Sequence, residues 1–249
     1  MTINKKLKKP NLVIIIPARL RSVRLSKKLV RKINNVPMVV RVAKSAINCK
    51  LGDVYVATDS KQIFNLCEKN KINAISTDTN INIGTDRVFS AYTNLKKHFD
   101  LIVNLQGDLP VFKKELIEKT VGLFADKTTE IASAVCDLES FEINDKNIVK
   151  ANVVLDKNNE GFAKDFVRFT KSQKNFYHHI GLYVYSSFSL KKFVNLKQTF
   201  NEVDRSLEQM RALDNKMNIK VVKLKSNPPS VDTLEDLKKI RLLFKNNNS

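Results

Sequence analysis

Short apolar runs alternate with longer amphipathic segments through the first half of the chain, and this alternation limits the folds that are open to it. The apolar runs are predicted strands, at 12–16, 54–57, 74–76, 101–105 and 131–135. The segments between them are predicted helices, at 38–47, 61–69, 85–95 and 113–124. Strands joined through helices form a parallel sheet with helices on both faces. We therefore predict an α/β fold on a mainly parallel sheet.

The pattern changes after about residue 137. Further strands are predicted at 150–155, 162–169, 181–185 and 220–224, and further helices at 190–195, 202–213 and 234–244. This order predicts a smaller mixed α+β insertion at 138–213. The core domain then consists of 11–137 and 214–245, and residues 1–10 form a mobile basic tail.

The length and hydropathy of the chain indicate a soluble protein. Its 249 residues can bury one domain with a subdomain, and 43% hydrophobic residues is ordinary. No apolar run approaches the roughly 18 residues of a membrane span, and no signal-peptide core follows the basic start. We expect a cytoplasmic protein without a membrane span.

The net charge of +19, from 44 Lys and Arg against 25 Asp and Glu, suggests an anionic partner. Nucleic acid is one possibility. However, the cations are spread along the chain and no RNA-binding aromatic motif accompanies them. Anionic small molecules are the favoured partners, and no specific nucleic acid is predicted.

The three cysteines, Cys49, Cys67 and Cys136, are odd in number and lack metal-site spacing. We predict that they are buried apolar residues of a protein in a reducing compartment. A catalytic thiol is the alternative.

The stretch 12–28 joins the first predicted strand to a loop with five cations. They are Arg19, Arg21, Arg24, Lys27 and Lys28. Ligands of open α/β sheets bind beyond the carboxyl ends of the strands. The loop could therefore hold a polyphosphate, although a solvated basic loop fits the same pattern.

Two aspartates are candidate metal ligands. Asp108 follows an apolar strand in VNLQGDLP, and Asp232 precedes the last predicted helix. Mg²⁺ typically takes one or two carboxylates plus phosphate oxygens. As alternatives, Asp108 is a turn residue and Asp232 is a helix N-cap paired with Glu235.

Polar residues lie at the ends or starts of further predicted elements. Gly84, Thr85 and Arg87 begin a helix whose free N–H groups could meet an anion or a base edge. Thr58 and Asp59 end a strand on the same rim. An ordinary helix cap explains the first group equally well.

The second half carries a further polar group. His179 enters a strand, where alternation points it inward, but a lone histidine is more often structural. Glu208, Gln209 and Arg211 lie on a predicted helix, and Glu208 with Arg211 could be an i,i+3 surface pair.

Nine fragments, in this order, resemble the cytidylyltransferases that activate 3-deoxy-manno-octulosonate (KDO) as its CMP derivative for lipopolysaccharide synthesis. They are PAR, VRLSKKLV, INNVPM, VATDS, IGTDR, VNLQGDLP, HIGLY, LEQMRAL and VDTLEDL. The resemblance runs from about residue 12 to 240. It implies a Rossmann-like nucleotide-diphospho-sugar transferase fold and a homodimer, with the insertion as a plausible contact.

The resemblance also implies roles for single residues. Arg19, Lys28, Asp108 and Asp232 would be catalytic, and the two aspartates would bind Mg²⁺. Together with the predicted strand ends, it implies nucleotide contacts from Pro17, Ala18, Arg19, Arg24, Lys28, Thr58, Asp59, Gly84, Thr85, Arg87 and Gln106. The implied sugar contacts are Gln106, Arg168, His179, Glu208 and Gln209.

The chain departs from the family pattern at several positions. Ser26 and Lys27 replace a Pro-Gly pair, Leu109 replaces a glutamate, and Arg205 stands where a second glutamate is usual. An Ile-Pro-Trp segment that usually follows the position of Arg168 is missing. These departures lie more on the sugar side than on the nucleotide side.

The reaction implied is attack of the KDO 2-hydroxyl on the α-phosphorus of CTP, which gives CMP-KDO and pyrophosphate. One alternative is the same reaction on another ulosonic acid, such as amino-KDO or a sialic-like acid. The other is a non-catalytic homologue that binds nucleotide or RNA.

Overall fold

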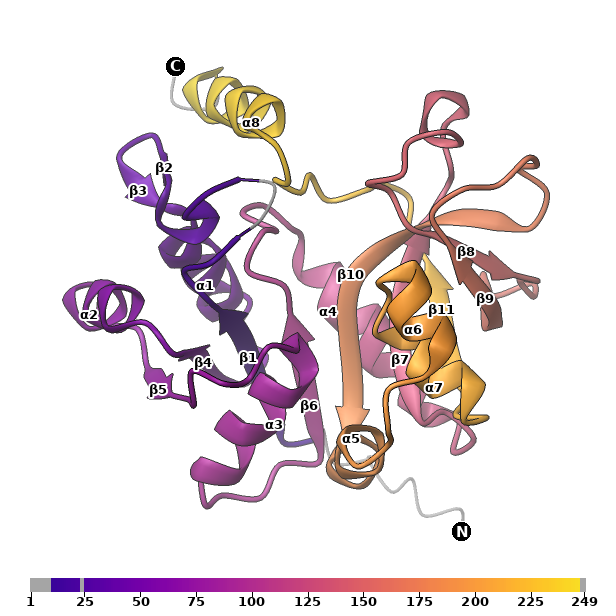
Figure 1. Cartoon of the computed structure of the whole chain (residues 1–249), viewed down its shortest axis with the longest axis horizontal. Coiled ribbons are helices and arrows are strands. Elements are labelled where there is room, and N and C mark those ends of the chain that lie inside the picture. The colour runs from indigo at the N-terminus through magenta and orange to yellow at the C-terminus, as the bar shows by residue number, and fades with distance from the viewer. Residues whose placement is uncertain (1–9, 23–24, 247–249) are drawn as a thin grey trace, which may run out of the picture.

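The computed structural model describes residues 10–22 and 25–246. Its main sheet consists of β1 (Leu12–Ala18), β4 (Asp53–Thr58), β5 (Ala74–Ser76), β6 (Leu101–Leu105), β7 (Ile131–Cys136), β8 (Lys150–Val153), β9 (Glu160–Val167), β10 (Phe176–Ser186) and β11 (Ile219–Lys223). Within the described ranges these nine strands lie in the order β5-β4-β1-β6-β10-β7-β11-β9-β8 (Figure 1). A short hairpin is separate, and it consists of β2 (Lys32–Ile33) and β3 (Val36–Pro37).

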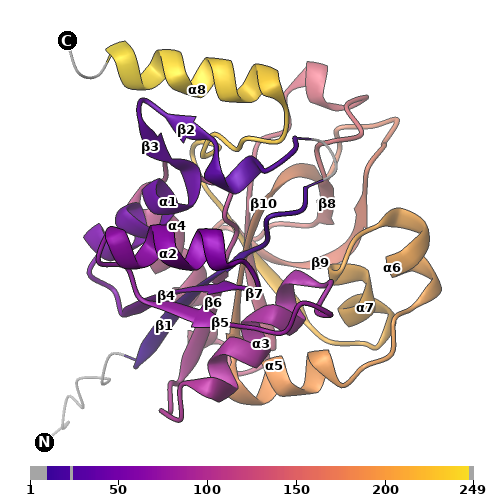
Figure 2. The ribbon, with the colours of Figure 1, turned by 60° about the vertical axis from the view of Figure 1, so that its left-hand side comes forward.

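Helices cover both faces of this sheet (Figure 2). The α-helices are α1 (Met38–Asn48), α2 (Lys61–Lys69), α3 (Gly84–Asn94), α4 (Lys114–Gly122), α5 (Ser187–Val194), α6 (Phe200–Arg205), α7 (Gln209–Asp214) and α8 (Leu234–Asn246). Short 3₁₀ turns are η1 (Lys28–Val30), η2 (Leu123–Ala125) and η3 (Ser140–Glu142). Helices α1, α2, α4 and α8 pack into one core, and α3, α5 and α7 into the other. The predicted α/β fold is confirmed.

Strand β1 shows why the strands in the first half of the chain can be predicted from apolar runs in the sequence. Ile14 and Ile16 belong to the core under α1, whereas Val13 and Ile15 belong to the core under α3. A strand that is buried on both faces appears in the sequence as a continuous apolar run. It pairs in parallel with β4 and β6, so the predicted parallel order holds here.

The second half of the sheet is mixed, and its antiparallel strands β8, β9 and β10 come from the segment after residue 137, for which the sequence predicts a mixed pattern. Strand β10 runs antiparallel to both β6 and β7, and β8 and β9 continue the sheet at its far edge. The predicted strand 181–185 is only the last part of β10, because the preceding run FYHH lacks a clear apolar alternation. The division into a core and an insertion at 138–213 stays a prediction.

The predicted helix 202–213 is wrong, because the chain breaks there into α6 and α7. Ser206 takes a left-handed conformation with φ of 52°, and its N–H closes α6 on Val203 O. An isolated residue in this conformation ends a helix. The break turns Glu208 and Arg211 toward the protein interior rather than along one exposed helix face.

The three cysteines are buried, as predicted. Burial raises the pKa of the Cys67 thiol to about 11 and of the Cys136 thiol to about 12. Both thiols are therefore protonated near neutral pH, which does not suit a nucleophile. None of the helices in the described ranges has the length and hydropathy that a membrane span requires.

Candidate active site

Two connected hollows lie beyond the carboxyl ends of β1 and β6. The first, here called the basic chamber, has a volume of about 770 Å³ and includes Arg19, Arg21, Lys28 and Lys146 in its lining. The second, here called the acidic chamber, has a volume of about 790 Å³ and is lined in part by Asp108, Glu142, Asp145, Glu208, Asp232, Glu235 and Asp236. Arg19, Gln106, Asp108 and Arg168 line both, so the two chambers form one cleft.

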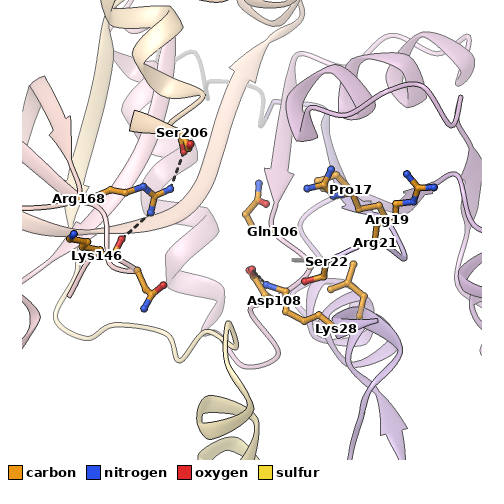
Figure 3. Close-up of a pocket in the computed structure, with 13 residues that line it drawn as sticks. Pro17, Arg19, Arg21, Ser22, Lys28, Gln106, Asp108, Lys146, Arg168 and Ser206 are labelled. Atoms are coloured by element: carbon orange, nitrogen blue, oxygen red, sulfur yellow. Dashed lines mark hydrogen bonds and ion pairs between the residues drawn. The ribbon is translucent and has the colours of Figure 1, made fainter. Parts of the chain in front are cut away.

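The walls of the cleft come from distant parts of the chain (Figure 3). Arg19 and Arg21 lie on one side, in the loop that follows β1, and Arg168 and Lys146 lie on the other, with Gln106 between them. Arg19 is held by a hydrogen bond of 3.1 Å from Nη1 to Asn82 O. Pro17 also lines the basic chamber, Ala18 is fully buried at the end of β1, and Arg24 lies outside the described residues.

Lys28 joins the two predicted metal-binding aspartates. Its Nζ lies 2.7 Å from Asp108 Oδ2 and 3.0 Å from Asp232 Oδ1. The loop after β6 and the chain before α8 meet here because Val231 N donates to Asp108 O. Burial alone would lower the Lys28 pKa, but the two carboxylates outweigh burial and raise it. Lys28 is therefore a fixed cation between two part-buried carboxylates.

The helix-capping alternative for Asp232 is wrong. The cap of α8 is a reciprocal pair of Thr233 and Asp236, in which the Asp236 carboxylate accepts from the backbone N–H groups of Asp232 and Thr233. Thr233 Oγ1 accepts in return from Asp236 N. This reciprocal cap leaves the Asp232 side chain to face Lys28 and the cleft.

The carboxylate pair suits a hard divalent cation. Two oxygen donors that converge on one ammonium can also converge on Mg²⁺, which accepts one or two carboxylates when phosphate oxygens and water complete its shell. Among the described residues, no group of three or more His, Cys, Asp or Glu side chains could hold a metal by itself. The chemistry of the pair therefore fits Mg²⁺ that arrives together with a polyphosphate.

The structure places a second set of predicted nucleotide residues outside both chambers. Arg87 is 2% exposed, and its guanidinium donates to Asp59 Oδ2, Thr77 Oγ1 and Ile81 O. Thr58 is also buried, with its hydroxyl accepting from Ser60 N. These contacts fix the segment that precedes α3, and a direct role in nucleotide binding stays a prediction.

Glu208 caps helix α3 from the opposite wall of the cleft. Its carboxylate accepts from Gly84 N at 3.1 Å, from Thr85 N at 3.3 Å and from Thr85 Oγ1 at 2.7 Å. The N-terminal N–H groups that the sequence leaves open for a ligand thus have a protein partner. Glu208 still lines the acidic chamber, so a sugar contact remains compatible with the cap.

The surface pair of Glu208 with Arg211 is wrong, because Arg211 is 2% exposed. Its Nε and Nη2 donate to the buried carboxylate of Glu202, and its Nη1 lies 3.7 Å from Asp86 Oδ1. Burial raises the Asp86 pKa. Arg211 therefore holds α3 and α6 together through ion pairs, behind the cleft.

Arg168 and a lysine that the sequence analysis missed organise the wall opposite Arg19. The Arg168 guanidinium donates to the backbone carbonyls of Arg205, Ser206 and Lys146. Lys150 is fully buried and donates to three carbonyls, of which one belongs to Arg168. The position of Lys150 in a predicted strand could have indicated this role, because a lysine that is buried in a strand must find hydrogen-bond partners.

Three departures from the family pattern have structural correlates. Lys27 takes the left-handed conformation, with φ of 53°, that a glycine adopts at little cost. Leu109 is 3% exposed and replaces a charge with an apolar contact. Arg205 forms an ion pair with Asp165 at 2.6 Å and donates to Phe166 O, so its charge is directed away from the cleft.

The acidic chamber also contains the other predicted sugar residues. His179 is 7% exposed and Gln209 is 6% exposed, and both line this chamber. Gln106 donates from Nε2 to Asn104 Oδ1 at 3.1 Å. The sequence analysis missed His178, which lines the same chamber and contacts Glu142 through Nδ1 at 2.9 Å.

Comparisons with known proteins agree over nearly the whole chain. A sequence model described as Cytidylyltransferase matches residues 13–219. The 3-deoxy-manno-octulosonate cytidylyltransferase of Rickettsia prowazekii (strain Madrid E) is 35% identical over 237 residues, which cover 94% of this chain and 95% of that protein. The enzyme of the same name from Francisella tularensis subsp. holarctica (strain LVS) is 37% identical over 248 residues, with coverage of 94% and 98%.

Solved structures extend this likeness to three dimensions. A CMP:2-keto-3-deoxy-manno-octonic acid synthetase complexed with CTP matches with a TM-score of 0.84 and 28% identity, over 95% of this chain and 99% of that one. A 4-diphosphocytidyl-2C-methyl-D-erythritol synthase from Anaerococcus prevotii DSM 20548 matches with a TM-score of 0.61 at 14% identity, over 96% of this chain and 100% of that one. The second match concerns the fold alone.

Removing the cap on α3 should lower stability. We expect Glu208→Ala to reduce the free energy of unfolding by about 1–3 kcal/mol, because three donors lose a charged acceptor. Urea unfolding followed by circular dichroism measures this. Asp204→Ala, at an exposed carboxylate of α6, is the control, with an expected change within about 0.5 kcal/mol. Equal stability of the two variants would contradict the cap.

Proposed function

Since the chain belongs to the cytidylyltransferase family, we propose that it joins CMP from CTP to the 2-hydroxyl of KDO and releases pyrophosphate. The observation that carries this proposal is the convergence of Lys28, Asp108 and Asp232 at the edge of a basic chamber. Such a site offers cations for phosphates and carboxylates for a metal. The curated relatives with this activity match over both walls of the cleft.

The basic chamber suits the triphosphate. Arg19, Arg21 and Lys28 lie on one wall, and Lys146 and Arg168 on the other. Transfer of a phosphoryl-type group asks the protein mainly for positioning and for stabilisation of charge. These cations would offset the charge that develops on the departing pyrophosphate.

The acidic chamber suits the hydroxyl groups of the sugar rather than its carboxylate. Among the described residues, seven acidic ones line it against three cationic ones, Arg19, Arg168 and Lys239, so a carboxylate placed deep inside would be repelled. Arg19 and Arg168 lie where the two chambers meet. We infer that the sugar acid directs its carboxylate toward this border and its hydroxyls toward Gln209, Glu208 and His179.

Asp108 and Asp232 would hold Mg²⁺, which would supply a lowered pKa for the attacking hydroxyl and charge neutralisation at the phosphates. Lys28 would then release the carboxylates and donate to phosphate oxygens instead. Among the described residues lining the cleft, no side chain is needed as a general base under this scheme.

We further propose that the product serves lipopolysaccharide synthesis and that the reaction takes place in the cytoplasm. The relatives carry the KDO cytidylyltransferase name, which supports the first point. The finding that no described helix could span a membrane is compatible with the second. The alternative of another ulosonic acid is not favoured by the comparisons.

Pyrophosphate release tests the reaction directly. With CTP and Mg²⁺, we expect turnover with KDO and little or none with amino-KDO or a sialic acid. Asp108→Asn should lower turnover by about a hundred- to thousandfold, because the electrostatic contact is lost while the volume is kept. Turnover with another ulosonic acid but not with KDO would contradict the substrate. Near-normal turnover of Asp108→Asn would contradict the metal assignment.

Lys28 should compete with the metal. Without nucleotide, we expect Lys28→Met to bind Mn²⁺, a probe for Mg²⁺, about tenfold more tightly than the natural chain, because no ammonium neutralises the two carboxylates. CTP binding should weaken in the same variant. Electron paramagnetic resonance of free Mn²⁺ gives the metal affinity without any turnover. Lys27→Met, at an exposed neighbour, should change neither affinity. Equal Mn²⁺ affinity of Lys28→Met and the natural chain would contradict the competition.

A homodimer through 138–213 is the last part of the proposal. Large apolar side chains on α5 and α6 are exposed, at 76% for Phe188, 81% for Phe200 and 63% for Val203. A contiguous exposed apolar patch is typical of a protein contact, and these side chains would contribute to such a patch. We expect sedimentation velocity to give a dimer for the natural chain and a monomer for Phe200→Asp, whereas an unchanged mass in Phe200→Asp would place the contact elsewhere.

A further inference from the structure

Ser133 and His179 form a buried polar pair beneath the acidic chamber. Ser133 lies on β7 and is fully buried, and His179 lies on the neighbouring β10. The Ser133 hydroxyl lies 2.9 Å from His179 Nε2 and 2.7 Å from the carbonyl oxygen of Leu182. The His179 ring also packs edge-on against Phe166, with ring centroids 5.1 Å apart. These contacts hold the imidazole in one orientation.

A bulge in β10 creates this arrangement. Ile180 pairs with Ala134 of β7 and Tyr183 pairs with Ser133, so two extra residues of β10 lie between successive partners. On the β7 side, Gly181 and Leu182 therefore lack register partners. The Ser133 hydroxyl supplies a donor for the Leu182 carbonyl that the bulge exposes.

Counting protons fixes the tautomer of His179. A serine hydroxyl has one proton to donate, and a carbonyl oxygen can only accept. The Ser133 proton is therefore directed to Leu182 O, and Ser133 Oγ must accept from His179 Nε2–H. In a neutral imidazole with a proton on Nε2, Nδ1 is an acceptor. Burial, with a smaller effect of His178, lowers the His179 pKa to about 3, so the ring is neutral.

The second ring nitrogen faces the chamber. Among the described residues, Asp86 Oδ1 is the one side-chain nitrogen or oxygen that is fully buried without a hydrogen-bond partner. His179 Nδ1 also has no partner among the described residues, so this nitrogen is not fully buried. His179 lines the acidic chamber together with Gly181 and Tyr183. The Nδ1 lone pair is thus available to a ligand in that chamber.

We propose that Ser133 is a positioning residue that fixes His179 as a hydrogen-bond acceptor, and that His179 thereby accepts a hydrogen bond from a hydroxyl group of the sugar. The carboxylate of the sugar acid has no proton to donate and does not fill this role. This inference rests on the proposed function for the identity of the sugar acid. A site that is built to bind a substrate hydroxyl discriminates against an analogue that lacks it, because the acceptor is then left unpaired. His179 would therefore contribute to the choice among sugar acids.

Nuclear magnetic resonance of the ring nitrogens tests the tautomer without substrate. Long-range ¹H–¹⁵N correlation on chain labelled at its three histidines should show His179 with a proton on Nε2 at neutral pH. His179→Gln assigns the signal. Ser133→Ala should lose the single tautomer, and Ser133→Thr, which keeps the hydroxyl, should retain it. A cationic ring or a proton on Nδ1 in the natural chain would overturn the proposal.

Adding the sugar acid tests the acceptor role. The Nδ1 resonance should move when KDO binds in the presence of CTP, and Ser133→Ala should raise the KM for KDO about tenfold while the KM for CTP changes less than about twofold. Pyrophosphate release in the natural chain with an unmoved Nδ1 resonance would overturn the acceptor role but leave the proposed function intact. Absence of pyrophosphate release with KDO would contradict the proposed function, while the tautomer spectrum still tests the role of Ser133.

Discussion

The contact of one ammonium with two carboxylates joins the segments on which the cleft depends. Lys28 begins η1, Asp108 follows β6 and Asp232 precedes α8, and the three side chains meet within 3.0 Å. Without a cation between them, two part-buried carboxylates would repel each other. The position of the last helix is thus linked to the basic loop that follows β1. Under the proposed mechanism, a divalent cation would replace the ammonium once phosphates are present to receive it.

A second set of charges connects the two walls behind the cleft. Glu208 caps α3, and Arg211 joins Glu202 to the neighbourhood of Asp86. Breaking such a buried pair from one side is costly, because the remaining charge has no partner. Helix α3 is therefore held by Glu208 and by Arg211 of α7.

Elements that depend on local pattern were predicted well. Strands 74–76 and 101–105 and helix 61–69 have the predicted bounds. Strand 101–105 is buried throughout and helix 61–69 is capped by Ser60, and both features leave direct marks in the sequence. The break at Ser206 and the first half of β10 were missed. Both are fixed by distant partners: Arg168 donates to Ser206 O, and β8 and β7 pair with the run of aromatic residues and histidines.

The sequence by itself determined the α/β class, the basic loop after β1 and the two aspartates as candidate metal ligands, because these follow from local patterning and from a resemblance carried by short motifs. Only the tertiary structure decided which charges meet. It pairs Asp108 and Asp232 with Lys28, gives Glu208 to α3, and sets the proton of His179 through Ser133. Hydrogen bonds and ion pairs act over about 3 Å, and residues separated by dozens of positions reach that distance only when the sheet has assembled.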